Sequence, residues 1–145
     1  VHDDNCYVLG GVAGHAGLFG NAADVLRMGE LWLRAFSQTN ANATTPLLNP
    51  AIAQKYFTKK HVHSNPRVLG WDGVSQEGSS TGHYFSLSSR GHLGFTGTSL
   101  WIDPVKKLVA VLLTNRVHPS RSNEKIKAFR PLFHDALMTD LGFAP

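Results

Sequence analysis

The sequence contains a single cysteine, Cys6, among its 145 residues. One thiol excludes an internal disulfide and any zinc site built from cysteines, and it leaves the cellular compartment open. The sequence also lacks an apolar run approaching the ~20 residues that a membrane-spanning helix requires, and it shows no signal-peptide pattern. We therefore expect no transmembrane segment within these residues.

Clustered positive charge is missing as well. The formal net charge is +4, but the lysines and arginines are scattered, and no basic cluster is interleaved with aromatic residues. This pattern argues against a nucleic acid as partner. With 42% apolar and 17% charged residues, the composition is that of a globular protein able to bury a core. We expect residues 1–145 to form one domain, or part of one, and the start at Val1 rather than Met favours a processed product or a fragment.

Three segments carry helical signals. Asn21 is a suitable cap for a helix that ends near Ser37, and Asn49 followed by proline predicts a short helix over 49–60. Ser122 is the expected cap of a last helix, over 122–142, in which Pro131 forces a kink or a restart. The expected buried face of the first helix carries Val25, Met28, Trp32 and Ala35.

From residue 68 onward the pattern changes to short β-rich stretches separated by turn residues. Strands are expected at 68–74, 83–89, 98–102 and 108–115. Short connections favour antiparallel pairing, and the apolar run LVAVLLT predicts a central strand covered on both faces by the first and last helices. The expected fold class is α+β, an antiparallel sheet flanked by helices.

The stretch GHLGFTG, residues 91–97, holds three glycines beside a strand. Glycine weakens a strand interior, so its presence suggests that something approaches the backbone closely, and a substrate is one candidate. The other interpretation is a β-turn or bulge with a partly exposed histidine. His15, in GHAGLF, leaves a similar choice between a packed histidine that fixes a loop and a contact with substrate.

Two stretches carry a family resemblance. GLFGNAADVLRMGELWL resembles the helix entry Gly-Leu-x-Ser-Thr-Ala-x-Asp-Leu of the serine hydrolases that include class C β-lactamases, low-molecular-weight penicillin-binding proteins and related esterases. GHLGFTGTSLWIDPVKKLVAVLLTNR is similar to the strand pair with the third catalytic motif of that family, Lys/His-Thr-Gly. The resemblance covers most of the chain, in the family's order, and implies the C-terminal portion of a β-lactamase/transpeptidase-like fold.

The resemblance also implies roles for individual residues. His92 would replace the motif lysine, and the backbone N–H of Phe95, directly after Gly94, would be an oxyanion donor. Leu93 stands where the family has a threonine or serine hydroxyl, which favours an ester or small amide over a β-lactam or a D-Ala peptide. Further substrate-contacting positions implied by the match are Thr96, Asn115, Arg116 and Arg121.

The family's nucleophile motif is missing from its expected place. No Tyr-x-Asn occurs, and the one Ser-x-x-K, Ser122 to Lys125, follows the GHLGFTG stretch, the wrong order for the family. GVSQEG likewise misses the Gly-x-Ser-x-Gly elbow by one residue. We therefore expect either that an upstream segment or a partner chain carries the nucleophile, or that this chain has lost catalysis, and we expect the chain to be inactive alone.

The expected reaction is acyl-enzyme hydrolysis of amide or ester bonds, on a small acyl substrate or a peptidoglycan peptide. The resemblance implies no metal or organic cofactor, and it favours an extracytoplasmic bacterial location. Two alternatives stay open: a non-catalytic module that binds a ligand or cell-wall peptide, and a metal-binding protein. The metal hypothesis uses His61 and His63 in HVH, with His2, Asp3 and Asp4 as further ligands.

Overall fold

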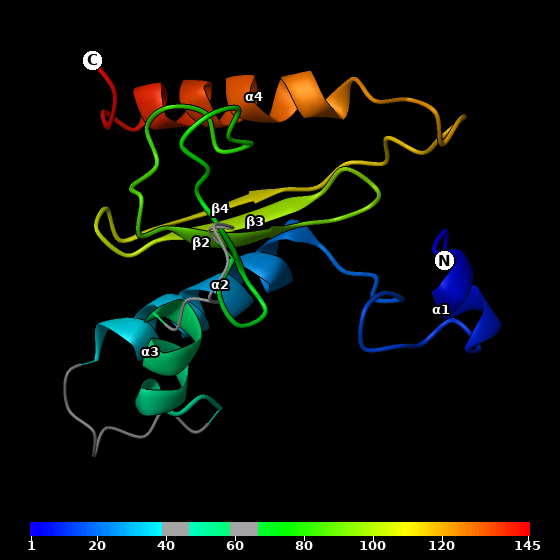
Figure 1. Ribbon diagram of the computed structural model, residues 1–145, viewed down its shortest axis with the longest axis horizontal. Coiled ribbons are helices and arrows are strands. Elements are labelled where there is room, and N and C mark those ends of the chain that lie inside the picture. Colours follow the sequence, from blue (N-terminus) through cyan, green and yellow to red (C-terminus); the bar gives the residue numbers. More distant parts are fainter. Residues whose placement is uncertain (39–46, 59–66) are drawn as a thin grey trace.

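A four-stranded antiparallel sheet, in the order β1-β2-β3-β4, organises the computed structural model, which describes residues 1–38, 47–58 and 67–145. Figure 1 shows α4 covering one face of the sheet, with α2 and α3 on the opposite side. The helices are α1 (Asp4–Val8), α2 (Ala22–Ser37), α3 (Pro50–Thr58) and α4 (Ile126–Asp140). The strands are β1 (Asp72–Gly73), β2 (Arg90–Leu93), β3 (Ser99–Asp103) and β4 (Leu108–Leu112). The α+β prediction is confirmed.

Helix α2 begins and ends where its sequence predicts. Asn21 caps it, with the side-chain oxygen accepting a 3.0 Å hydrogen bond from the Asp24 N–H. The expected buried face is wrong at Met28, which is 53% exposed. The helix instead approaches the sheet through Gly29, where an added Cβ would collide with Val109. A side chain at Gly29 would force the helix away from β4, so glycine sets the distance between the layers.

An aromatic cluster joins α2, α3 and the chain before β1. The Trp32 ring stacks on Phe57 with centroids 5.7 Å apart, and it meets Trp71 edge-on at 5.2 Å. Helix α3 is capped by Asn49, whose side chain accepts from the Ala51 N–H at 2.8 Å. This cluster explains why a short helix is held stably under the sheet, because large aromatic side chains contribute much buried apolar area.

The α4 face of the sheet holds the main hydrophobic core, formed by Phe85, Trp101, Ala110 and Met138. Helix α4 continues through Pro131 without a restart. Its first residue is Ile126, and Ser122 does not cap it as expected. The Ser122 hydroxyl instead pairs with that of Ser120 at 2.7 Å in the preceding turn.

The strand expected at 83–89 is absent, although its alternating pattern is β-like. Its backbone is bonded outside any strand ladder: the Ser86 N–H donates to the buried Asp103 carboxylate at 2.8 Å, and the Ser89 N–H donates to the Ser86 carbonyl. The strand that precedes β3 is instead β2, Arg90–Leu93, in residues that the local sequence pattern assigned to a turn. Gly91 is required there because a Cβ would collide with the Trp101 ring on β3.

Strand β4 lies at the edge of the sheet rather than in its centre. It pairs with β3 alone among the described strands, so the expected central position is wrong. The expected coverage by helices on both faces is confirmed, because Val109 faces α2 and Ala110 packs into the core beside Met138 of α4. The short helix α1 was not expected; Asp3 caps it through a 2.7 Å bond from the Cys6 N–H.

Candidate functional site

The candidate site begins at the part of β2 that lies beyond its pairing with β1. Strand β1 pairs only with Arg90 and Gly91, so His92 and Leu93 continue β2 with one edge unpaired among the described residues. The His92 side chain is exposed, whereas Leu93 is half-buried on the α4 side of the sheet. The backbone of β2 is therefore open to an extended ligand at these two residues.

A tight turn, residues 94–98, links β2 to β3. The Gly94 N–H donates to the Thr98 carbonyl at 2.8 Å, and the Gly97 N–H donates to the Gly94 carbonyl at 3.0 Å. Gly97 has φ +98°, a conformation that favours glycine, and a Cβ on Gly94 would collide with the Thr98 hydroxyl. The glycines of GHLGFTG are thus explained by the turn and by the contact of Gly91 with Trp101, and close approach of a substrate stays a prediction.

Arg130 of α4 fixes this turn from below. Its buried guanidinium donates to the carbonyls of Gly97 at 3.1 Å, Gly94 at 3.2 Å and Thr98 at 3.1 Å. Burial, and secondarily the charge of Arg116, lowers the pKa of Arg130 from its usual value. The three carbonyl acceptors, rather than a carboxylate, compensate the buried charge of Arg130. These charge-assisted hydrogen bonds tie the turn to α4.

Arg116 holds the outer side of the same turn. Its Nε donates to the Phe95 carbonyl at 2.8 Å, and its guanidinium lies over the Phe95 ring, 4.8 Å from the centroid. The Thr96 carbonyl accepts from the Thr114 hydroxyl and from the Arg116 N–H, each at 2.9 Å. All five carbonyls of residues 94–98 are therefore hydrogen-bonded.

The Phe95 N–H, in contrast, donates to no residue that the structure describes, a property it shares with Thr96 and Thr98. A main-chain N–H held rigid and unpaired beside an open strand edge suits a developing negative oxygen. The geometry is therefore compatible with the oxyanion role that the resemblance implied for Phe95.

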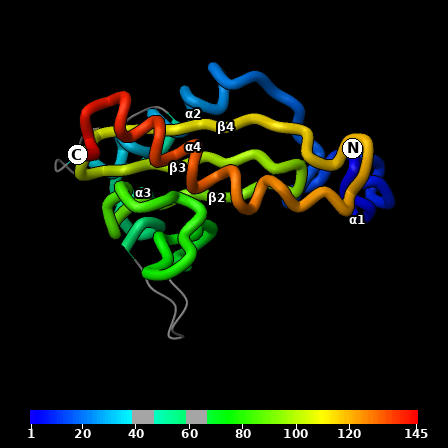
Figure 2. The backbone as a smooth tube through the Cα atoms, turned by 90° about the horizontal axis from the view of Figure 1, so that it is seen from above, coloured from blue at the N-terminus to red at the C-terminus, as the bar shows by residue number. Residues whose placement is uncertain are grey.

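The other expected site residues lie around this turn. Arg121 is 6.0 Å from the Phe95 ring centroid, and it binds the Asp4 carboxylate at 2.9 Å and the His2 carbonyl at 2.8 Å. This pairing lowers the pKa of Asp4 and brings the N-terminal helix beside the site, as Figure 2 shows. Asn115 is exposed, directly before Arg116.

Ser99 has a histidine beside it, as an activated serine nucleophile would. The Ser99 hydroxyl lies 3.4 Å from His134 Nε2, but both residues are buried, so substrate cannot reach them. The Ser80 carbonyl accepts at 2.8 Å from Nδ1 of His134, which fixes the tautomer. Burial lowers the pKa of His134, opposed by the Ser80 hydrogen bond and the Asp135 charge and aided by Arg130.

The metal hypothesis finds no cluster within the described ranges 1–38, 47–58 and 67–145. Asp3 accepts from the Cys6 N–H and contacts His15 at 3.1 Å, while Asp4 pairs with Arg121. The backbone hydrogen bond from Cys6 is the main cause that lowers the pKa of Asp3. His61 and His63 lie outside the described residues.

The comparison with protein families decides the affiliation. Residues 2–132 match the family model described as Beta-lactamase. This chain belongs to the β-lactamase family. The match spans both segments on which the resemblance was based, and it makes the chain part of a serine hydrolase family.

The curated relatives have similar names. A "Putative D-alanyl-D-alanine carboxypeptidase" of Salmonella typhi is 34% identical over 129 residues, which cover 87% of this chain and 29% of that protein. The protein of the same name from Salmonella agona is 33% identical over the same shares. The chain therefore spans less than a third of the length of these relatives. No solved structure matches it significantly. None of the described helices is long and apolar enough to cross a membrane.

Sequence reasoning missed Arg130 and Thr114. Arg130 lies 33 residues from Gly97 in the chain and sits directly before a proline in an amphipathic segment. Nothing local marks it as a partner of the GHLGFTG turn. Thr114 ends an apolar run, where a threonine is unremarkable; only the return of the chain to residue 96 shows its role.

Proposed function

We propose that this chain forms one wall of the active-site cleft of an acyl-transferring serine hydrolase, with the Phe95 N–H as an oxyanion donor. The single observation that carries the proposal is the turn at residues 94–98. Its five carbonyls are hydrogen-bonded, while the Phe95 N–H donates to no described residue and lies beside the part of β2 that β1 leaves unpaired. Such pre-organised donors stabilise the tetrahedral intermediate without reorganisation during the reaction.

The proposed substrate bears an amide or ester bond. The names of the Salmonella relatives suggest a peptide that ends in D-alanine. Leu93, however, offers no hydroxyl to a substrate carboxylate, and its side chain points into an adjacent pocket beside Trp101. Nε and Nη1 of Arg116 donate to the carbonyls of Phe95, Arg121 and Asn123, so these two groups are not available to a substrate carboxylate. These features favour an uncharged acyl ester or amide over a terminal carboxylate.

The nucleophile is proposed to come from a segment upstream of the matched region or from a partner chain. Within the described residues, no accessible serine has a lysine or histidine base beside it: Ser99 is buried, and Ser122 pairs with Ser120. The isolated chain is accordingly proposed to be catalytically inactive.

A chimera tests the proposal. The part of the Salmonella typhi relative that precedes the aligned region is joined to residues 1–145, and hydrolysis of p-nitrophenyl acetate and of a D-Ala-D-Ala peptide is measured. Phe95→Pro removes the N–H, and we expect a loss of about 10²–10³ in kcat on either substrate. Phe95→Leu retains the N–H and should lose far less.

Equal losses in the two variants would assign Phe95 a packing role and contradict the oxyanion proposal. A folded chimera that binds the peptide saturably without turnover would instead support the non-catalytic binding module. Circular dichroism of each variant separates a lost fold from a lost donor.

A further inference from the structure

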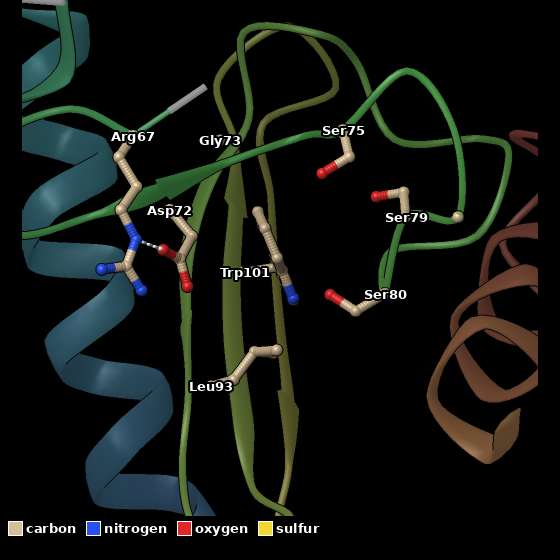
Figure 3. A pocket seen from close by; sticks show the side chains of 9 residues that line it. Arg67, Asp72, Gly73, Ser75, Ser79, Ser80, Leu93 and Trp101 are labelled. Atoms are coloured by element: carbon tan, nitrogen blue, oxygen red, sulfur yellow. Dashed lines mark hydrogen bonds and ion pairs between the residues drawn. The ribbon is translucent and has the colours of Figure 1, made fainter. Parts of the chain in front are cut away.

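A polar pocket lies beside the candidate site, on the α4 side of the sheet. It has a volume of about 260 Å³ and is bounded by β1, by the 75–80 loop and by Leu93 and Trp101 of the sheet. Figure 3 shows the Arg67–Asp72 ion pair on one side and three serines on the other. Apart from Leu93, none of the residues proposed for acyl chemistry lines it.

Trp101 makes this pocket unusual. The side chain is 1% exposed, and its indole Nε1 is buried without a hydrogen-bond partner among the described residues. Buried indole N–H groups are normally paired, so this donor indicates a missing acceptor. In Figure 3 the nitrogen-bearing edge of the indole points toward the side of the pocket where Ser80 lies.

The remaining polar groups of the pocket are mostly donors. The hydroxyls of Ser75 and Ser80 bond to no described residue, whereas that of Ser79 is paired with Thr81 at 2.7 Å. The one acid, Asp72, is neutralised by the Arg67 guanidinium at 2.6 Å. An indole N–H and two hydroxyls favour an oxygen acceptor, and because the Arg67–Asp72 pair is neutral, the acid does not repel an acceptor with negative charge.

The apolar lining and the size restrict the ligand further. Leu93 and the indole ring offer a contact for a short aliphatic group. The volume is below the ~300–1,000 Å³ of sites for drug-sized ligands, so a smaller ligand is favoured. We propose that this Trp101 pocket binds a small aliphatic carboxylate, with one carboxylate oxygen accepting from Trp101 Nε1 and from the Ser80 hydroxyl.

The inference does not depend on the acyl chemistry, because it concerns binding alone. A bound carboxylate would nevertheless contact Leu93, the residue before the turn at 94–98. The proposed ligand site therefore lies next to the candidate oxyanion donor.

The test titrates sodium propionate into the ¹⁵N-labelled full chain and follows the three assigned indole N–H signals by NMR. We expect a saturable shift of the Trp101 signal with a Kd in the millimolar range, and no such shift with 1-propanol or sodium chloride. Ser80→Leu fills the pocket and should weaken binding at least about tenfold. Ser88→Leu, an exposed serine outside the pocket, is the matched control and should bind as the unaltered chain does.

Three results would overturn the proposal: no saturable Trp101 shift at about 100 mM propionate, an equal shift with propanol, or equal binding by both leucine variants. Cross-relaxation of the indole N–H with a long-lived water, without a propionate effect, would show a structural water in place of a ligand site. Should Ser80→Leu lose its native spectrum, NOEs from the propionate methyl to Leu93 in the unaltered chain decide: their presence supports the site and their absence refutes it.

Discussion

Replacing Arg130 by methionine tests how the candidate oxyanion turn is held. Methionine keeps the aliphatic stem and the helix propensity of α4 but removes all guanidinium hydrogen bonds. The Gly94 and Thr98 carbonyls keep one partner each within the turn, whereas the Gly97 carbonyl loses its only described donor. The variant therefore leaves one buried acceptor unpaired and weakens two others.

The expected cost follows from these three bonds. An unpaired buried acceptor costs about 1–3 kcal/mol, and each lost bond to a charged donor about 1.5–3 kcal/mol. Removing Arg130 also removes the cost of burying its charge, which offsets part of this destabilisation, since burial already lowers the pKa of Arg130. We expect the free energy of unfolding to fall by about 2–4 kcal/mol in urea titrations, with the turn amides exchanging faster with solvent.

Lys127→Met is the matched control on the same helix. Its ammonium is exposed and, among the described residues, pairs with Glu124 alone, so the change should leave the urea midpoint nearly unchanged. A loss of less than about 1 kcal/mol in Arg130→Met, or unchanged exchange at residues 94–98, would refute the assignment of Arg130 as the support of the turn.

Three further predictions concern other contacts. Because the pKa of His134 is lowered in the folded chain, the unfolded chain binds the proton first as pH falls below about 6.5. The free energy of unfolding should then fall by up to about 1.4 kcal/mol per pH unit. Urea titrations at several pH values measure this slope, and His134→Gln should remove it. Gly91→Ala should destabilise by about 1–3 kcal/mol or more, because its Cβ meets the Trp101 ring; an unchanged urea midpoint would contradict that packing. Arg121→Ala should release α1 from the site without shifting the global unfolding midpoint, and unaltered hydrogen exchange at residues 4–8 would argue against the contact with Asp4.

Helices α2 and α3 were predictable because their signals are local. Asn21 and Asn49 bond to backbone N–H groups within three residues, so the cap can be recognised in the sequence itself. The local residue pattern placed a turn where strand β2 lies, because Gly91 has low β propensity and owes its place to the Trp101 ring across the pair. The family resemblance, which implied a His-Leu-Gly strand, did place a strand there. The strand expected at 83–89 failed because Asp103, distant in sequence, takes the Ser86 N–H.

The candidate site was predictable only in part. The resemblance located the turn around Gly94 and Phe95, but a free N–H can be recognised only when the partners of its neighbours are known. Those partners come from residues 114–130, and their side chains show no pattern that points to the turn. The unpaired indole of Trp101 is likewise a property of packing, since its sequence position indicates an ordinary core residue.

The most direct test of the central claim is intact-mass analysis after exposure to a fluorophosphonate, performed on this chain alone and on the chimera with the upstream Salmonella segment. The account predicts no adduct on the isolated chain and a single adduct on a serine of the upstream segment in the chimera. An adduct on Ser122, or on any other serine of this chain, would contradict the claim that it supplies a cleft wall and not the nucleophile.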